Sequence, residues 1–127
     1  MSWRWVDQRL LVLLHDESLA MHGGASGLRD AGRLESALSR PLNLAVYGEP
    51  DAAALAASYA SGLAQNQPFV DGNKRAAFLS VGLFIGLNGR RITASQAEAT
   101  VAVFGLACGD VDEATFAAWL RERIASR

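Results

Sequence analysis

The sequence predicts an all-α fold, a compact bundle of about six helices around a central apolar helix, and three observations support this prediction. Half of the 127 residues are hydrophobic and 20% are charged, a composition typical of a globular chain. Alanine, the strongest helix former, occupies 23 positions, whereas proline occupies 3. Apolar residues recur at helical spacing through most of the chain. The length fits one domain, so we expect residues 1–127 to form a single domain.

Two helices are expected in the first third of the chain. Leucines between residues 7 and 21 recur at spacings that suit a helix with a broad buried face, and Asp7 is a suitable N-cap. Asp30 can cap a second helix. We expect that helix to end at Pro41, because proline disrupts a helix interior, and residues 43–49 to form an irregular connection.

The middle of the chain predicts two helices joined by a short loop. Residues 51–66 form the alanine-rich third helix, with Pro50 in a favourable position at its start. Proline, aspartate and glycine follow in close order between residues 67 and 73, which is typical of a loop. The fourth helix, residues 73–87, leaves no polar face, so we expect the other helices to surround it.

Two further helices complete the prediction. A capping box at Ser95 begins a fifth helix that ends near Cys108, and burial is the simplest interpretation of that cysteine. Asp112 can cap a sixth helix that runs towards residue 121. Ile124 continues the apolar spacing on its inner side.

Charge and cysteine content restrict the classes of partner and the compartment. The net charge is −1, so the surface as a whole does not attract nucleic acid or anionic membranes, and we expect no direct DNA binding. The apolar run at residues 76–88 is too short for a membrane span, and we expect no membrane association. The N-terminus lacks the pattern of a secretory signal, and one cysteine suits a reducing compartment. We therefore expect a cytoplasmic protein.

The residues that suggest chemistry lie where the fourth helix begins. Backbone N–H groups at a helix start lack intrahelical partners and lie at the positive end of the helix dipole, so they can hold a phosphate. Gly72 allows close backbone approach, and Asn73 offers an amide donor. Lys74 adds a mobile charge and Arg75 a planar fork for two phosphate oxygens. We expect these four residues to bind nucleotide phosphates.

An acidic residue beside such a site would repel phosphate unless it held a cation. Asp71 therefore fits a magnesium ligand, since Mg²⁺ prefers one or two carboxylates together with water and phosphate oxygens. A simpler interpretation is an ordinary turn in which Asp71 caps a solvated helix. A Walker-type loop is excluded, because no strand precedes the segment and no Ser or Thr follows a Gly-Lys pair.

The stretch from Gln67 to Arg75 reads Gln-Pro-Phe-Val-Asp-Gly-Asn-Lys-Arg. It resembles the Fic/Doc signature, His-x-Phe-x-Asp-Gly/Ala-Asn-Lys/Gly-Arg, at every defined position except the first. Residues 14–16, 22–24 and 27–41 are similar to the N-terminal half of the Doc (death-on-curing) branch. The resemblance covers about residues 6–120, and a motif of this length is a specific signal.

The resemblance implies an all-helical toxin of a toxin–antitoxin operon. Fic relatives transfer AMP from ATP to protein hydroxyls, whereas the Doc branch is a protein kinase that acts on a threonine of translation elongation factor Tu and blocks translation. Lys74 stands where AMP-transferring members usually have a second glycine, which favours the Doc branch. The resemblance also implies that Asp71 would ligate Mg²⁺ and that Arg75 would clamp the ATP phosphates oriented by Asn73 and Lys74. Phe69 would anchor the loop from beneath.

Gln67 stands where the family has the histidine thought to activate the acceptor hydroxyl. A neutral imidazole takes a proton near pH 7, and an amide does not. We therefore expect Gln67 to leave binding intact and to remove a proton-transfer contribution of about 10²–10⁴-fold. The residue has three possible origins: a deliberate substitution, an escape mutation selected during cloning, or a natural change. The intact remainder of the motif favours a recent or deliberate change.

Two other functions stay open at this point. One is Fic-like transfer of AMP to a protein hydroxyl, and the other is a non-catalytic protein that binds its antitoxin. The usual partner of the Doc branch is an antitoxin with a disordered tail that folds into a groove as an amphipathic helix, and the resemblance suggests the same here.

Overall fold

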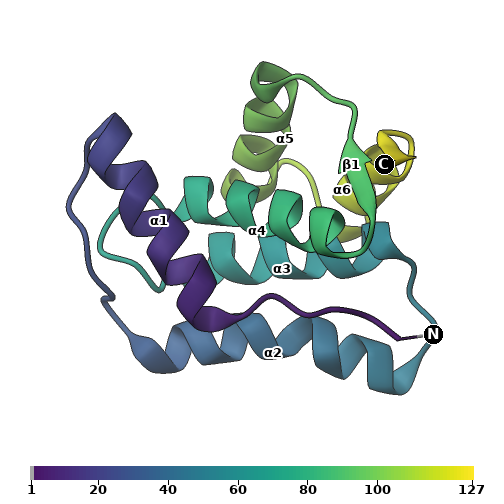
Figure 1. Ribbon diagram of the computed structural model, residues 1–127, viewed down its shortest axis with the longest axis horizontal. Helices are drawn as coiled ribbons and strands as arrows, with labels where there is room; N and C mark the ends of the chain where they lie inside the picture. The colour runs from purple at the N-terminus through teal and green to yellow at the C-terminus, as the bar shows by residue number, and fades with distance from the viewer. Residues whose placement is uncertain (1) are drawn as a thin grey trace.

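The protein is a bundle of six helices with a small two-stranded sheet, in a computed structural model that describes residues 2–127 (Figure 1). The all-α prediction is therefore confirmed. In chain order, the elements are α1 (Gln8–His22), α2 (Ala31–Tyr47), α3 (Ala52–Asn66), α4 (Asn73–Leu87), β1 (Arg90–Ile92), α5 (Gln96–Cys108), α6 (Glu113–Arg121) and β2 (Ile124–Ser126).

Four helices begin at the cap that the sequence predicts, and α3 begins at Asp51, which the sequence placed in the first turn and which is instead the N-cap. The side chains of Asp7, Asp30, Asp51 and Asp112 each accept a backbone hydrogen bond from the first turn of their helix. Ser95 and the third residue of α5 form a reciprocal capping box. These starts are set by contacts within four residues, so they follow directly from the local sequence.

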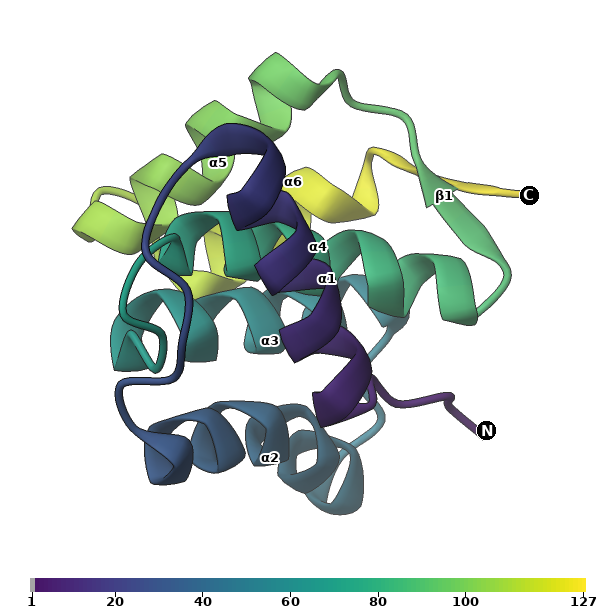
Figure 2. The ribbon, with the colours of Figure 1, turned by 60° about the vertical axis from the view of Figure 1, so that its left-hand side comes forward.

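The centre of the bundle is α3, whereas the apolar pattern pointed to α4. Eleven of the fifteen residues of α3 are buried, because α2, α4, α5 and α6 all pack against it. Alanine side chains allow this close approach on every side: a Cβ added at Gly62 would lie 3.2 Å from atoms of Ala37 in α2. The fourth helix covers α3 on one side and is itself crossed by α1 (Figure 2).

The second helix does not end at Pro41 but continues to Tyr47, so the predicted irregular connection at residues 43–49 is largely helical. Proline in a helix interior removes one backbone hydrogen bond. Pro41 nevertheless lies on the buried face of α2 with Leu34, Ala37 and Leu38. Burial of this face against α3 offsets the lost bond.

A two-stranded antiparallel sheet was absent from the prediction. Arg90 pairs with Ser126 and Ile92 with Ile124, which joins the end of the chain to the segment after α4. Ile124 therefore packs on the core from β2 and not from the inner side of α6. Three-residue strands are too short to leave an alternating pattern in the sequence.

The chain reverses direction between α3 and α4, and this loop (Gln67–Gly72) lies at the end of the bundle where α1 ends and α2 begins (Figures 1 and 2). Trp3 and Trp5 pack beside Phe84, towards the other end of α4. Within residues 2–127, no helix is both long enough and apolar enough to cross a membrane.

Candidate functional site

The loop that joins α3 to α4 is held by its own side chains. Phe69 is 2% exposed and anchors the loop in the core, as expected. Asn73 bonds to both backbone groups of that residue: Asn73 Oδ1 accepts from the Phe69 N–H at 2.9 Å, and Asn73 Nδ2 donates to the Phe69 carbonyl at 3.1 Å. In this structure Asn73 therefore shapes the loop, which leaves one Nδ2 proton for a ligand.

The segment before α2 pairs with this loop as a short strand would. The N–H of Arg29 donates to the Pro68 carbonyl at 2.8 Å, and the N–H of Val70 donates to the Gly27 carbonyl at 3.0 Å. Leu28 and Phe69 form an isolated antiparallel bridge. The loop is thus held both by Asn73, at its own end, and by the backbone of the segment before α2.

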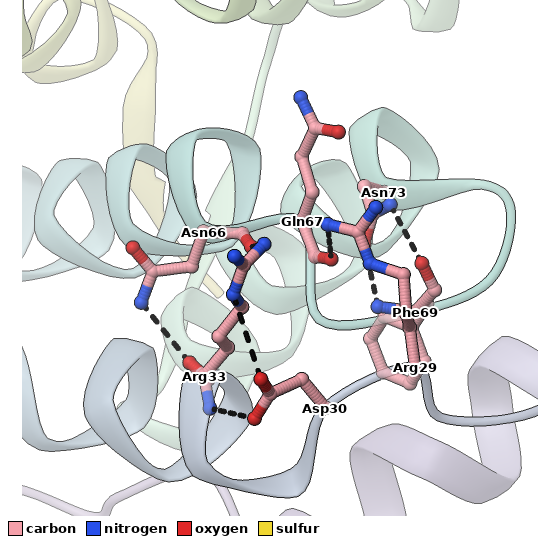
Figure 3. Close-up of polar contacts among 7 residues, drawn as sticks. All are labelled: Arg29, Asp30, Arg33, Asn66, Gln67, Phe69 and Asn73. Carbon is pink, nitrogen blue, oxygen red and sulfur yellow. Dashed lines mark hydrogen bonds and ion pairs between the residues drawn. The ribbon is translucent and has the colours of Figure 1, made fainter.

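Two arginines bind the carbonyls at the end of α3 (Figure 3). Arg29 Nη2 donates to the Gln67 carbonyl at 3.0 Å, and Arg33 Nη1 donates to the Asn66 carbonyl at 3.3 Å. The Asn66 amide donates back to the Arg33 carbonyl at 3.0 Å. Carbonyls at a helix end lack intrahelical partners and carry partial negative charge, so guanidinium groups stabilise them.

Gln67 is the only residue other than glycine with a positive φ among residues 2–127. Its φ of 48° and ψ of 58° place it in the left-handed region, where it ends α3. Its backbone is held by the N–H bond to the Leu63 carbonyl and by Arg29. The exposed side chain extends away from these contacts (Figure 3). Such a conformation costs energy and often marks a functional position.

Asp71 presents its carboxylate at the open side of the loop. Oδ1 accepts from the N–H of Gly72 at 2.9 Å, and Oδ2 accepts from the N–H of Ala25 at 3.3 Å. Gly72, at φ 74°, is the N-cap of α4, and no side chain caps this helix. Asp71 is therefore not the cap of this helix, and that part of the simpler interpretation is wrong. The start of α4 is free to hold an anion.

These groups line one cleft of about 490 Å³, which α5 closes on the opposite side. Lys74 Nζ lies 5.6 Å from the centre of the Phe104 ring of α5, so the cation crosses the cleft. Cys108 is exposed at the end of α5, and its predicted burial is wrong. The lining residues are Ala64, Gln67, Val70, Asp71, Gly72, Asn73, Lys74, Phe104, Ala107 and Cys108.

The sequence model of the Fic/DOC family matches residues 5–85, more than half of the chain. The chain belongs to the Fic/DOC family.

Two curated relatives agree with this assignment. The protein kinase doc of Escherichia phage P1 is 33% identical over 119 residues, which cover 93% of this chain and 94% of the relative. The toxin Doc of Mycolicibacterium smegmatis (strain ATCC 700084 / mc(2)155) is 39% identical over 75 residues, 57% of each chain.

Five of the six predicted site residues of this Fic/DOC chain lie in the same cleft: Gln67, Asp71, Gly72, Asn73 and Lys74. Arg75 lies apart from them. Its Nη1 donates to the Ser18 hydroxyl of α1 at 3.4 Å, in a neighbouring cleft of about 280 Å³ that Lys74 also lines.

Sequence reasoning missed the residues that fix the loop from other elements. Arg29 and Arg33 precede the loop by more than thirty positions, and Ala25 contacts Asp71 only through its backbone N–H. His15 of α1 is fully buried, and its ring lies 4.2 Å from that of Phe69. The signals for these contacts are distant in sequence, so no local motif identifies them.

Proposed function

We propose that this chain is the toxin of a type II toxin–antitoxin system, built as a Doc-like protein kinase. Its substrate would be a threonine of translation elongation factor Tu, and phosphorylation would block translation. The observation that carries the proposal is the uncapped start of α4, with Asp71 and Lys74 in one cleft of nucleotide size. The relatives named as protein kinase doc and toxin Doc support it.

ATP is the proposed nucleotide, with its phosphates against the start of α4. The first-turn backbone N–H groups and Lys74 supply positive potential there, and no acidic residue lies in the first turn. Asn73 would offer its remaining amide proton to a phosphate oxygen. Arg75 would reach the phosphates after leaving Ser18, a long contact between exposed groups that costs little to break.

The residues fit Mg²⁺ that arrives with the nucleotide. Each oxygen of the Asp71 carboxylate accepts one N–H, so both keep a lone pair on the exposed side of the loop. Within residues 2–127, no three His, Cys, Asp or Glu side chains gather into a metal site. One carboxylate with phosphate oxygens and water is the ligand set that Mg²⁺ prefers. Bound there, the ion would neutralise charge on the phosphates.

The phosphoryl step requires a proton acceptor. The threonine oxygen would attack the γ-phosphorus, the bond to the β-phosphate oxygen would break, and ADP would leave while the hydroxyl releases its proton. Gln67 lines the cleft at the motif position of the histidine. Because an amide does not accept this proton, the chain with Gln67 would bind Mg-ATP and transfer phosphate about 10²–10⁴-fold more slowly than a histidine form.

The proposed protein partner besides the substrate is an antitoxin with a disordered tail that folds on binding. The net charge of −1 supports an operon role through that partner and not through direct DNA contact. The cytoplasm, where elongation factor Tu and ATP are found together, is the proposed compartment.

The test is the Gln67→His variant, supplied with elongation factor Tu and with ATP labelled at either the γ or the α phosphate. Transfer of the γ label alone, with growth arrest in cells that lack antitoxin, is the expected result. Transfer of the α label alone would assign AMP transfer. Gln67→Ala is the matched control, because it changes the same position without adding a base, and it should stay as slow as the parent chain.

A non-catalytic, antitoxin-binding protein is the second candidate, and Gln67 itself favours it. Retained Mg-ATP binding without transfer of either label by Gln67→His would support this alternative. Such a result would also remove the kinase assignment, because the variant restores the full signature.

A further inference from the structure

His15 is the most tightly enclosed polar group next to the site. It lies in the middle of α1, is fully buried, and is 56 residues distant from the loop residue that it contacts. Its Nε2 lies 2.9 Å from the backbone carbonyl oxygen of Asp71. A carbonyl only accepts, so Nε2 carries the proton and donates it.

The other ring nitrogen has no partner. Nδ1 of His15 is buried, and no hydrogen-bonding atom of residues 2–127 reaches it. Buried polar atoms without partners are rare, and a core position in a helix is served better by leucine or phenylalanine. The hydrogen bond to the Asp71 carbonyl is thus the only one that offsets the cost of burying this imidazole.

That bond determines the direction of a peptide group. In a trans peptide the C=O and the following N–H point in opposite directions, and no cis peptide occurs among the described residues. The Asp71 carbonyl points inward to His15, so the Gly72 N–H points outward, where Asp71 Oδ1 accepts it at 2.9 Å. The bond from His15 thus aligns the donor that holds the Asp71 carboxylate.

The loop is also shaped to fit the imidazole. A Cβ added at Gly72 would lie 2.8 Å from His15 Cε1 and 3.1 Å from Leu19 Cδ2, so only glycine lets the loop rest on the ring. A Cβ added at Gly24 would lie 3.0 Å from Asp71 Oδ2, which brings the Ala25 N–H within reach of that oxygen. Both carboxylate oxygens are therefore placed by backbone that packs around α1.

We propose that His15 is a positioning residue, which fixes the Asp71–Gly72 peptide and thereby aims the Asp71 carboxylate and the start of α4 at the Mg-nucleotide. The proposal rests on the proposed function, because it assigns His15 a role in that same site. A positioning role requires a hydrogen-bond donor at the place of Nε2, where it reaches the Asp71 carbonyl. A packing role requires an aromatic ring against Phe69.

Two substitutions separate these roles. His15→Phe keeps a ring beside Phe69 and removes the donor, whereas His15→Gln removes the ring and keeps an N–H donor at similar reach. If His15 only packs, His15→Phe should keep a higher Mg²⁺-dependent ATP affinity than His15→Gln. The positioning role gives the reverse order, with Mg²⁺-dependent ATP affinity about 10- to 100-fold weaker in His15→Phe and mostly retained in His15→Gln.

The measurements are Mg²⁺-dependent ATP binding in the parent chain, transfer kinetics in the Gln67→His background, and the backbone amide NMR signals of Gly72 and Ala25. Positioning predicts a fall in kcat and displaced amide signals for His15→Phe, with both restored by His15→Gln. It also predicts that long-range proton–nitrogen spectra place the His15 proton on Nε2.

The proposal is overturned if the two variants have equal ATP affinity and equal amide signals, or if His15→Phe binds ATP more tightly than His15→Gln. If His15→Phe does not fold, His15→Asn replaces it: this amide is too short to reach the carbonyl, so it should behave worse than His15→Gln. If Gln67→His transfers no label, the kinase assignment fails, while the binding and NMR comparisons still decide the role of His15.

Discussion

Asn73 closes the α3–α4 loop by bonding to both backbone groups of Phe69, which lies four residues before it in the chain. The asparagine is the first residue of α4, and the phenylalanine is buried beneath it. The pair therefore ties the start of α4, where we propose that phosphate binds, to the core. The same contact therefore holds the loop in its conformation and fixes the position of the first residue of α4.

Replacing Asn73 tests this link between loop and ligand. We expect Asn73→Ala to lower the free energy of unfolding by about 1–3 kcal/mol, because it leaves the N–H and carbonyl of Phe69 without partners. Mg-ATP affinity should fall with it. Urea denaturation and ATP titration measure both quantities. Asn43→Ala, at an exposed position of α2, is the control: it should leave the affinity unchanged and should not lower the stability, because alanine is the better helix former. Loss of affinity with unchanged stability would show that Asn73 acts on the ligand alone.

Lys74 is predicted to provide the main side-chain cation for the phosphates. Lys74→Met keeps the aliphatic stem over Phe104 and removes the charge. A hydrogen bond to a charged group contributes about 1.5–3 kcal/mol, so the Kd for Mg-ATP should rise about 10- to 100-fold. Calorimetric titration at two salt concentrations measures this effect. Arg91→Met removes an exposed cation from β1 and should leave the Kd unchanged. An equal effect of both variants would mean that overall charge, and not the cleft, binds ATP.

The left-handed backbone of Gln67 predicts an unusual response to glycine. A residue with a side chain at φ 48° is strained, so Gln67→Gly should be neutral or stabilise the fold by up to about 1 kcal/mol. Gln67→Val should destabilise it, since a β-branched side chain tolerates positive φ poorly. Chemical denaturation measures these differences.

Ala118→Gly, at an exposed position inside α6, is the control and should cost about 1 kcal/mol. An equal cost for glycine at positions 67 and 118 would contradict the assigned backbone conformation. Histidine occurs in the left-handed region more often than most residues, so Gln67→His should not disturb the loop.

The local parts of this structure could be predicted from sequence, and the non-local parts could not. The predicted caps at Asp30 and Asp112 depend on hydrogen bonds within three residues, so a short window of sequence contains the whole cause. The loop between α3 and α4 was predicted for the same reason. Pro41 was misjudged because its burial against α3 is a tertiary effect that outweighs helix propensity.

The candidate site likewise has a local part that the sequence predicts and a non-local part that it does not. Its residues from Gln67 to Lys74 are contiguous, and the motif predicted that they act together. The groups that hold them, His15 and Arg29, come from α1 and from the segment before α2. Neither has a feature in the sequence that indicates its contact, because the contact exists only after the helices pack.

The ion pair between Asp51 and Arg121 predicts how stability depends on pH. It joins the start of α3 to the end of α6, and its hydrogen bond from Arg121 holds the pKa of Asp51 below its ordinary value of 3.8. The charged form therefore stabilises the fold above the unfolded pKa of about 4, and this contribution is lost as the pH falls through the folded pKa.

Asp51→Asn keeps an N-cap acceptor and removes the charge. Both partners are half-exposed, so we expect it to cost less than about 1 kcal/mol near pH 7 and to differ little from the parent near pH 3. Thermal unfolding across this pH range measures the difference, with Glu17→Gln on the exposed face of α1 as the charge-matched control. A cost of Asp51→Asn that stays constant down to pH 3 would show that the cap, and not the ion pair, is what Asp51 contributes.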